Sequence, residues 1–480
     1  MTKTQNNDPK NTLVMKFGGT SVGTSEAMEK TLKIIDSAKN EWKNVVVVTS
    51  ALSGVTNWLL KGAAKSSQGE MQSIYQADSE IRQAHEKIAD KLICDQIRRK
   101  QVKQEISHLI SDFINLCQAI AVLGEATPRA IDAVSSLGER MSVRLLAAAL
   151  EDKGVAAQVV ESTQLIVTDN CFQNAHPDFK ATGKITKQVL QPVFNSGKIP
   201  IITGFIGSTP DGIVTTLGRG GSDYSAGIIA AALQADEVWI WTDVDGVMSA
   251  DPRRVPHAQT IPELTYKEVA ELAYFGAKVL HPKTIRPIVE AGINLRICNT
   301  FNPDHPGTRL IPDNHNNSKG AIKAVTTIEG QKLITVEGRG MLGVPGVAAR
   351  AFAAVASTGT SVPLITQASS EQSICFAVPM EAADGVISAL EDTFENEIIK
   401  RDIDRIWATD EVVIITMVGA GMIRTPGIAG RIFSALGNKK VNVIAIAQGS
   451  SEVSISMVVS QADANEGLMA LHELILGEHQ

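Results

Sequence analysis

Paired cysteines are missing from this 480-residue sequence. Its five cysteines are scattered and form no CxxC motif, which argues against a zinc site or a disulfide framework and favours reduced, cytosolic thiols. A basic excess is also missing, because 45 Lys and Arg residues face 52 Asp and Glu residues, and this balance argues against a nucleic-acid partner. After the polar first twelve residues, no apolar run is long enough for a signal sequence or a membrane span. We therefore expect a cytoplasmic protein without a membrane partner.

Several familiar catalytic motifs are absent as well. The sequence has no GxxxxGK[ST] phosphate-binding loop, and the acidic residue that a dinucleotide-binding loop requires is not evident in the right context. No Ser-His-Asp arrangement stands out, and His281 has no second histidine at metal-ligand spacing, so we interpret it as structural. We assign no residue of the sequence as a metal ligand.

The sequence does contain the pattern of a buried parallel sheet. With 44% hydrophobic and 20% charged residues it is an ordinary globular chain, long enough for two to four domains. Short runs of almost unbroken hydrophobicity alternate with helical patterns, and such strands are buried on both faces. The runs are residues 13–17, 45–49, 199–205 and 238–242. This alternation predicts a three-layer α/β/α domain with a mainly parallel sheet.

Two segments interrupt this pattern. Residues 69–150 carry no strand signal and have apolar residues at helical spacing, which predicts a helical insertion within a domain that ends at residue 311. The polar, asparagine-rich stretch 312–320 is typical of a linker.

An internal repeat follows the linker. Residues 333–378 align without a gap to residues 414–459, and each copy is predicted to run strand, Pro-Gly, helix, strand, turn, strand. We expect two βαββ modules of the ferredoxin-like kind, at 321–400 and 401–480, that bind a small ligand, or a duplication used only for dimerisation. Residues 321–330 could add a strand to either copy.

Polar and glycine-rich motifs cluster where predicted strands end. KFGGTS begins at Lys16, SALSGVTN at Ser50 and WTDVDG at Trp241, while LGRGGSD around Arg219 precedes a helix. Open α/β sheets bind ligands at the carboxyl ends of their strands, and glycines there let the backbone approach a phosphate. An arginine flanked by three glycines is hard to explain by packing alone, because glycine costs conformational entropy. A fifth motif, FGAKVLHP, supplies Lys278 as a second candidate cation for phosphate.

Taken together, KFGGTSVG, SALSGVTN, SLGERMS, TLGRGGSDYSA, WTDVDGV with DPR, and FGAKVLHPKTI closely resemble the aspartate kinases, amino-acid kinases with C-terminal ACT modules. The motifs occur in order from Lys16 into the second repeat, so the resemblance covers nearly the whole chain. It implies phosphorylation of the side-chain carboxylate of L-aspartate by ATP and Mg²⁺, the first step towards threonine, lysine and methionine. A homodimer or homotetramer joined through the ACT modules is also implied.

The resemblance implies roles for individual residues. Lys16, Asp223 and Lys278 would be catalytic, with Lys16 on the transferring phosphate and Asp223 orienting the lysines. Aspartate would be held by Ser50, Thr56, Glu139 and Arg219, with Glu139 on its ammonium group and Arg219 on a carboxylate. The nucleotide would be bound by Gly18, Gly19, Thr242, Asp243 and Arg253.

The repeats resemble those of aspartate kinases fused to homoserine dehydrogenase. This implies that Gln367 and Gln448 contact an effector amino acid, and the absence of an aspartate at Pro363 favours threonine over lysine. We expect a kinase without the dehydrogenase half. Three rival readings are a kinase for another small carboxylate, a catalytically inactive amino-acid sensor and an oxidoreductase. The inactive sensor is disfavoured because its candidate cations and their partner are intact, namely Lys16, Arg219, Asp223 and Lys278.

Overall fold

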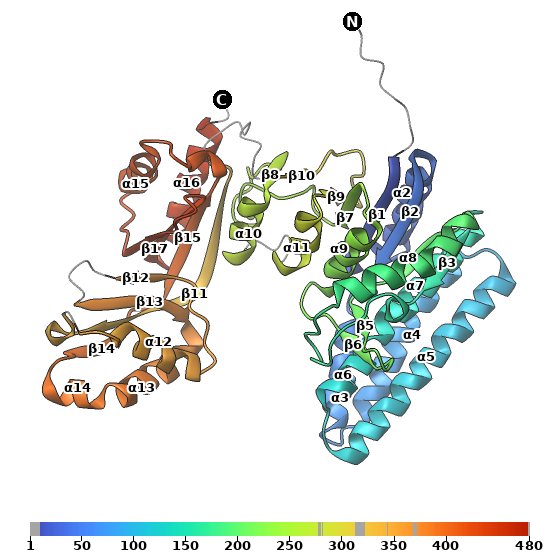
Figure 1. Ribbon diagram of the computed structural model, residues 1–480, viewed down its shortest axis with the longest axis horizontal. Helices are drawn as coiled ribbons and strands as arrows, with labels where there is room; N and C mark the ends of the chain where they lie inside the picture. Colours follow the sequence, from blue (N-terminus) through green and yellow to red (C-terminus); the bar gives the residue numbers. More distant parts are fainter. Residues whose placement is uncertain are drawn as a thin grey trace, which may run out of the picture. The chain divides into compact units, whose positions relative to one another are not determined.

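The computed structural model describes residues 10–276, 280, 282–312, 322–342, 344–367 and 372–478, which form two compact units (Figure 1). The first takes its described residues from 1–247, 262–264 and 280–312, and the second from 248–261, 265–279 and 313–480. The predicted kinase domain of residues 1–311 stays a prediction, and within it residues 248–261 and 265–276 pack with the repeats. Apart from Pro312, the predicted linker lies outside the described residues.

The first unit is built on a mainly parallel sheet of eight strands in the order β3-β4-β2-β1-β7-β9-β10-β8. Its strand β1 pairs in parallel with β2 and β7, and β10 pairs antiparallel with β9. The strands are β1 Lys10–Phe17, β2 Trp42–Thr49, β3 Ala157–Val160, β4 Ile199–Thr203, β7 Glu237–Thr242, β8 Glu263–Thr265, β9 Asn294–Asn299 and β10 Thr308–Ile311, with a separate hairpin of β5 Ile206–Ser208 and β6 Val214–Thr216.

Helices cover both faces of this sheet, which confirms the three-layer α/β/α prediction. Leu13, Met15 and Phe17 share one apolar cluster with helices α2 and α7, and α9 packs with α8 and α11 in the opposite layer. Their bounds are α1 Gly19–Val22, α2 Ser25–Glu41, α7 Leu137–Asp152, α8 Phe179–Asn195, α9 Gly221–Leu233 and α11 Pro282–Glu290.

Residues 55–135 are helical and have no strand. They form α3 Val55–Ser66, α4 Gln72–Leu92, α5 Gln96–Leu123 and α6 Pro128–Ser135. By length and composition, α5 is the one helix among the described residues apolar enough to cross a membrane. Its stripe of Val102, Ile106, Ile110, Phe113 and Cys117 is buried among α3, α4 and α7, as in the core helix of a globular bundle.

The second unit joins the two repeats in one seven-stranded antiparallel sheet. Each repeat has the predicted order of strand, helix, strand and strand, and a further helix follows. Gly346 and Gly427 cap the first helix of each copy with φ of 89° and 87°, values that favour glycine. The elements are β11 Ala324–Glu337, α12 Val347–Ser357, β12 Ile365–Gln367, β13 Ser373–Pro379, α13 Ala383–Thr393, α14 Glu395–Lys400, β14 Arg405–Ala408, β15 Val412–Val418, α15 Ile428–Asn438, β16 Ala445–Gln448, β17 Ser454–Ser460 and α16 Ala464–Glu478.

Strand β11 settles where residues 324–331 belong. They pair with β15 of the second repeat, whereas residues 331–337 pair with β13 of the first. The register shifts between Ile328 and Gln331, where Gly330 has a φ of 66°. One strand therefore serves both repeats.

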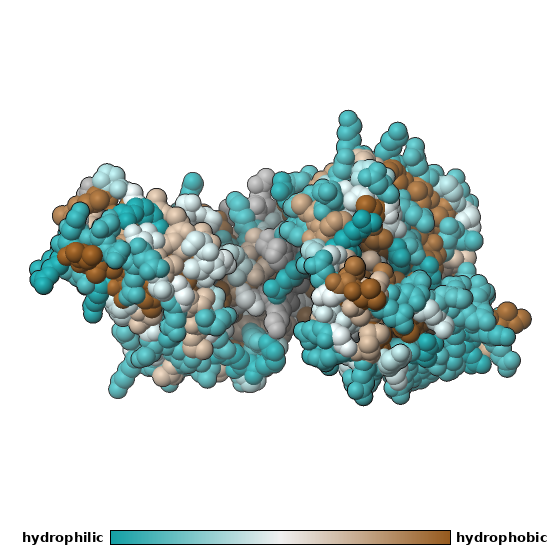
Figure 2. Space-filling model, turned by 90° about the horizontal axis from the view of Figure 1, so that it is seen from below, coloured by the Kyte–Doolittle hydropathy of each residue, from teal (hydrophilic) through white to brown (hydrophobic). Residues whose placement is uncertain are grey.

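Polar contacts bind residues 248–261 and 265–276 to the repeats within the second unit. Ser249 lies in hydrogen-bonding distance of His472 Nε2, at 2.9 Å, and its carbonyl accepts from the Val325 N–H. In helix α10, Tyr266–Tyr274, the buried Glu268 pairs with Lys323 at 3.0 Å and accepts from the Ala420 N–H. A buried ion pair needs its partner, so α10 is held to the repeats. In Figure 2, hydrophilic residues cover most of the face shown, and hydrophobic ones form separate patches.

Candidate active site

A cavity of about 620 Å³ in the first unit brings together seven of the residues selected from the sequence. It lies where β1 and β2 end and α9 begins, the edge at which parallel sheets bind ligands. The seven are Lys16, Gly19, Ser50, Thr56, Glu139, Arg219 and Asp223.

Lys16 provides a buried positive charge in this cavity. It is the last residue but one of β1, between Val48 and Ile240 on the neighbouring strands, and is 9% exposed. Its Nζ lies 2.6 Å from a carboxylate oxygen of Asp223 in the first turn of α9. The ion pair fixes the ammonium group in place and partly offsets the cost of burying it.

Backbone conformation explains why glycines stand on both sides of Arg219. Gly218 and Gly220 have φ of 79° and 70°, where an L side chain is strained, and Gly220 caps the N-terminus of α9. Arg219 between them is exposed, and within the described part of the chain its guanidinium makes no ion pair. It is therefore available to a carboxylate in the cavity.

Glu139 provides a buried carboxyl group. It lies in the first turn of α7, where Oε1 accepts a hydrogen bond from the Ala51 N–H at 3.2 Å and Oε2 has no partner among the described residues. Burial raises the pKa of the Glu139 carboxyl to about 8, although the Ala51 N–H and the charge of Lys16 act against this rise. A buried carboxyl oxygen without a partner is costly, and a cationic ligand would satisfy it.

The two loops at the ends of β1 and β2 pack backbone against backbone. A side chain at Gly19 would come within 3.0 Å of the Ala51 carbonyl, and the Ser53 N–H donates to the Gly19 carbonyl. The Gly18 N–H donates to the carbonyl of Trp241 at 3.3 Å, so it is engaged within the protein. Protein packing thus explains part of the glycine pattern that we assigned to phosphate.

The other predicted nucleotide residues do not line the cavity. Thr242 ends β7, beside β1, and its hydroxyl donates to Asp243 at 3.1 Å. Arg253 belongs to the second unit, where its guanidinium forks onto Asp251. Lys278 lies outside the described residues.

Asp132 and Phe205 also line the cavity, and our sequence analysis missed both. Asp132 is buried in α6 and accepts hydrogen bonds from the Gln173 N–H and from the N–H and hydroxyl of Thr216, while burial raises the pKa of its carboxyl. Phe205 has a φ of 69°, an unusual value for a bulky residue. Asp132 lies in the predicted helical insertion, where no local motif marks it. Nothing in the sequence near Phe205 signals its strained backbone.

The predicted effector residues lie at matching places in the repeats. Gln367 ends β12 and Gln448 ends β16, and both are exposed. Gln367 lines a cavity of about 400 Å³ with Pro345 and Gly346, where α12 begins. The spacing of the repeat thus puts both glutamines at the same position of the fold.

Comparisons with known proteins agree with this arrangement. Residues 11–299 match the amino acid kinase family, and residues 334–394 and 415–474 each match the ACT domain. Over 96% of its length the chain is 38% identical to a bifunctional aspartokinase/homoserine dehydrogenase of Arabidopsis thaliana, and it spans about half the length of that protein and of similar bifunctional relatives from Arabidopsis thaliana and Zea mays.

Other relatives match this chain over nearly their own whole length. The aspartokinase of Schizosaccharomyces pombe is 33% identical, over 98% of this chain and 94% of its own. Escherichia coli aspartokinase III, solved with aspartate and ADP, is 31% identical with a TM-score of 0.78, over 96% of this chain and 99% of its own. The chain therefore belongs to the amino acid kinase family and, within it, to the aspartate kinases that carry ACT domains.

Proposed function

We propose that this chain transfers the γ-phosphoryl group of ATP to the side-chain carboxylate of L-aspartate, giving an acyl phosphate and ADP. The observation that carries the proposal is one cavity that holds a buried carboxyl with a free oxygen, Glu139, together with two cations, Lys16 and Arg219. Glu139 suits the substrate's ammonium group, Arg219 a carboxylate and Lys16 the phosphoryl group. Ser50 and Thr56, in the same wall, would add hydrogen bonds.

The nucleophile needs no general base. A carboxylate is already ionised at neutral pH, since an ordinary Asp side chain titrates near a pKa of about 3.9. The obstacle is charge repulsion, because an anion must approach a polyanion. Two unit charges about 4 Å apart interact by roughly 4 kcal/mol at an effective dielectric of 20. Lys16, held by Asp223, opposes this repulsion, so catalysis rests on positioning and charge stabilisation.

We further propose that ATP binds along the same edge of the sheet. Thr242 and Asp243 follow β7, next to β1, and Gly18 and Gly19 start the loop beyond Lys16. Gly19 opens helix α1, so its N–H is one of those that a helix leaves for an acceptor at its start. We assign Arg253 and Lys278 to the ATP phosphates on the family resemblance alone. Mg²⁺ would be held mainly by the phosphates, with few protein ligands, and would neutralise charge.

Formation of aspartyl hydroxamate tests the proposal. Full-length protein is incubated with ATP, Mg²⁺, hydroxylamine and L-aspartate, with L-glutamate and an ATP-free reaction as controls. We expect product from aspartate only. Folded protein that binds ATP and forms no product from aspartate would overturn the assignment and favour another substrate or an inactive sensor.

We propose that the repeats inhibit the kinase when they bind L-threonine, with L-lysine as the alternative effector. Gln367 lines the cavity beside α12, and no carboxylate stands at Pro363 to pair with a lysine ammonium group. E. coli aspartokinase III has been solved with lysine, which keeps that alternative in the test. Inhibition by threonine that is lost in Gln367→Ala or Gln448→Ala supports the proposal, whereas inhibition by lysine alone contradicts it.

We also propose that the protein forms a homodimer or homotetramer through the repeats, in the cytoplasm. The edge strands β12 and β16 expose Ile365 and Ile446, and Ile444 beside them is also exposed. Apolar edge strands tend to pair with another chain. Light scattering of the wild type and of the double variant Ile365→Lys, Ile446→Lys tests the proposed oligomer. A monomeric wild type contradicts the proposal.

A further inference from the structure

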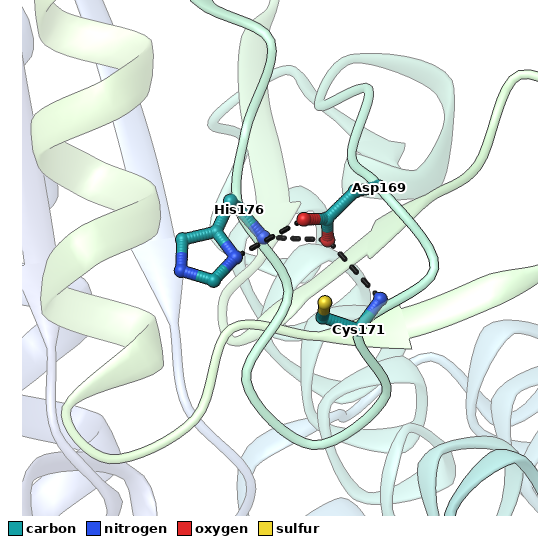
Figure 3. A group of neighbouring side chains, drawn as sticks. All are labelled: Asp169, Cys171 and His176. Carbon is teal, nitrogen blue, oxygen red and sulfur yellow. Dashed lines mark hydrogen bonds and ion pairs between the residues drawn. The ribbon is translucent and has the colours of Figure 1, made fainter.

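The loop from Asp169 to His176 brings three different metal-binding side chains together outside the residues assigned to the kinase reaction. Ligand atoms of Asp169, Cys171 and His176 all lie within 4.8 Å of one another, and all three residues are exposed (Figure 3). No other group of this kind is found among the described residues. The sequence analysis expected no zinc site because no cysteines are paired, and it did not consider these three residues as a group.

The fold of the loop holds the three groups in place. The Asp169 carboxylate accepts hydrogen bonds from the Cys171 and His176 N–H groups at 3.2 and 2.9 Å, and the Asp169 N–H donates to the His176 carbonyl. Thr168, just before the loop, pairs with Pro177 just after it. The ligands are therefore presented by a closed loop, and their positions do not depend on long side chains.

The distances between these three ligand atoms are close to those between the ligand atoms of a bound metal ion. Ligand atoms of a tetrahedral Zn²⁺ site, at bond lengths of about 2.0–2.3 Å, lie roughly 3.3–3.8 Å apart. His176 Nδ1 and Asp169 Oδ2 are 3.1 Å apart, joined by a hydrogen bond. The Cys171 sulfur lies within 4.8 Å of both other ligand atoms, at most about 1 Å beyond this range.

We propose that Asp169, Cys171 and His176 form a binding site for one divalent transition-metal ion of the Zn²⁺ class. Thiolate, imidazole and carboxylate together suit Zn²⁺ or Co²⁺, whereas Mg²⁺ and Ca²⁺ prefer oxygen ligands only. The ion takes the place of the proton between Nδ1 and Oδ2, which moves to Nε2 of the neutral ring. The thiol proton of Cys171 is released to solvent, and water completes the coordination.

The site adjoins the kinase cavity. Gln173, inside the same loop, lines that cavity, and its N–H donates to Asp132. The side chain of Asn174 accepts a hydrogen bond from Lys283, and a Cβ at Gly218 would lie 3.0 Å from the Gln173 carbonyl. A bound ion therefore restrains the loop against which the Arg219 segment packs.

Titration of full-length protein with Co²⁺ tests the proposal, because a thiolate ligand gives a charge-transfer absorption band. We expect one Co²⁺ per chain at micromolar concentration, displaced by Zn²⁺ and not by Mg²⁺. The band disappears in Cys171→Ser, and Co²⁺ binds about tenfold or more weakly in His176→Gln. The matched controls Cys94→Ser and His108→Gln, both at exposed positions, keep the band and the affinity.

Alkylation gives a second readout that needs no variant. Zn²⁺ slows the reaction of iodoacetamide at Cys171 and leaves the rate at Cys94 unchanged, as followed by peptide mass spectrometry. The proposal is overturned if wild type shows no band, if the band survives in Cys171→Ser or disappears in Cys94→Ser, or if Zn²⁺ protects both cysteines equally. None of these outcomes depends on kinase activity.

Discussion

The buried carboxyl of Glu139 makes aspartate binding depend on pH in a defined direction. Burial raises its pKa to about 8, whereas the substrate's ammonium group pairs with the ionised form. Below pH 8 the carboxyl must lose its proton before it binds this group, at a cost of about 1.4 kcal/mol for each pH unit. We expect the KM for aspartate to fall about tenfold per pH unit from pH 6 to pH 8 and to level off above pH 8.

The variant Glu139→Gln removes the charge and keeps the shape of the side chain. A hydrogen bond to a charged group contributes about 1.5–3 kcal/mol, so the KM for aspartate at pH 8 should rise about 10- to 150-fold. The slope between pH 6 and pH 8 should vanish, because no carboxyl remains to titrate. The KM for ATP should change little.

Initial rates at saturating ATP, over this pH range and for both proteins, provide the measurement. The exposed variant Glu41→Gln is a control that should behave like wild type. A wild-type KM for aspartate that is flat from pH 6 to pH 8 would refute the reasoning, and so would a slope that persists in Glu139→Gln.

The Glu139 carboxyl also makes the free energy of unfolding depend on pH, in a direction that its raised pKa determines. Between the ordinary pKa of 4.5 and the folded value of about 8, the folded chain holds a proton that the unfolded chain has lost. The contribution of Glu139 to the free energy of unfolding therefore decreases as pH rises through this window. Denaturant unfolding should show wild type losing stability relative to Glu139→Gln between pH 6 and pH 8.

Three further variants test other contacts. Lys16→Ala should lower turnover by two to three orders of magnitude while circular dichroism and ATP binding persist, and a loss below tenfold would remove Lys16 from its assigned role. Asp132→Asn should raise the KM for aspartate and lower the denaturation midpoint, because an amide cannot accept from all three donors now bound; unchanged values would contradict this. Glu268→Gln should destabilise the chain by about 3–5 kcal/mol, because it breaks the buried ion pair between Glu268 and Lys323. Glu290→Gln, which removes an exposed pair with Arg286, should hardly move the same midpoint, and equal effects of both variants would refute the argument.

Much of the site could be predicted because parallel strands end at one edge of a sheet. Lys16, Ser50 and Arg219 lie far apart in the sequence, yet each belongs to a motif at a strand end or a helix start, and one cavity contains all three. Asp132 could not be found in this way. Its role depends on Thr216, 84 positions away, and nothing local marks that pairing.

The division into units shows a second limit of local patterns. Ser249 follows the strand-end motif at Thr242 after a few residues, so the sequence assigns both to one domain. The partner of Ser249 is His472, 223 positions later, and this contact belongs to the second unit. Residues 248–261 follow one part of the first unit in the sequence and precede another, yet they pack with the repeats, where their polar groups find partners.

Strand β11 shows why the repeat alone left one question open. The sequence assigns residues from 333 onward to the first repeat, and it leaves open which repeat takes residues 321–330. Gly330, with a φ of 66°, marks the register shift that lets Ala324–Ile328 pair with β15 and Gln331–Glu337 pair with β13. A single strand thus carries hydrogen bonds into both repeats, so a displacement of β15 and one of β13 both strain the same backbone. The two repeats are therefore one structural body, even though their sequences align as two separate copies.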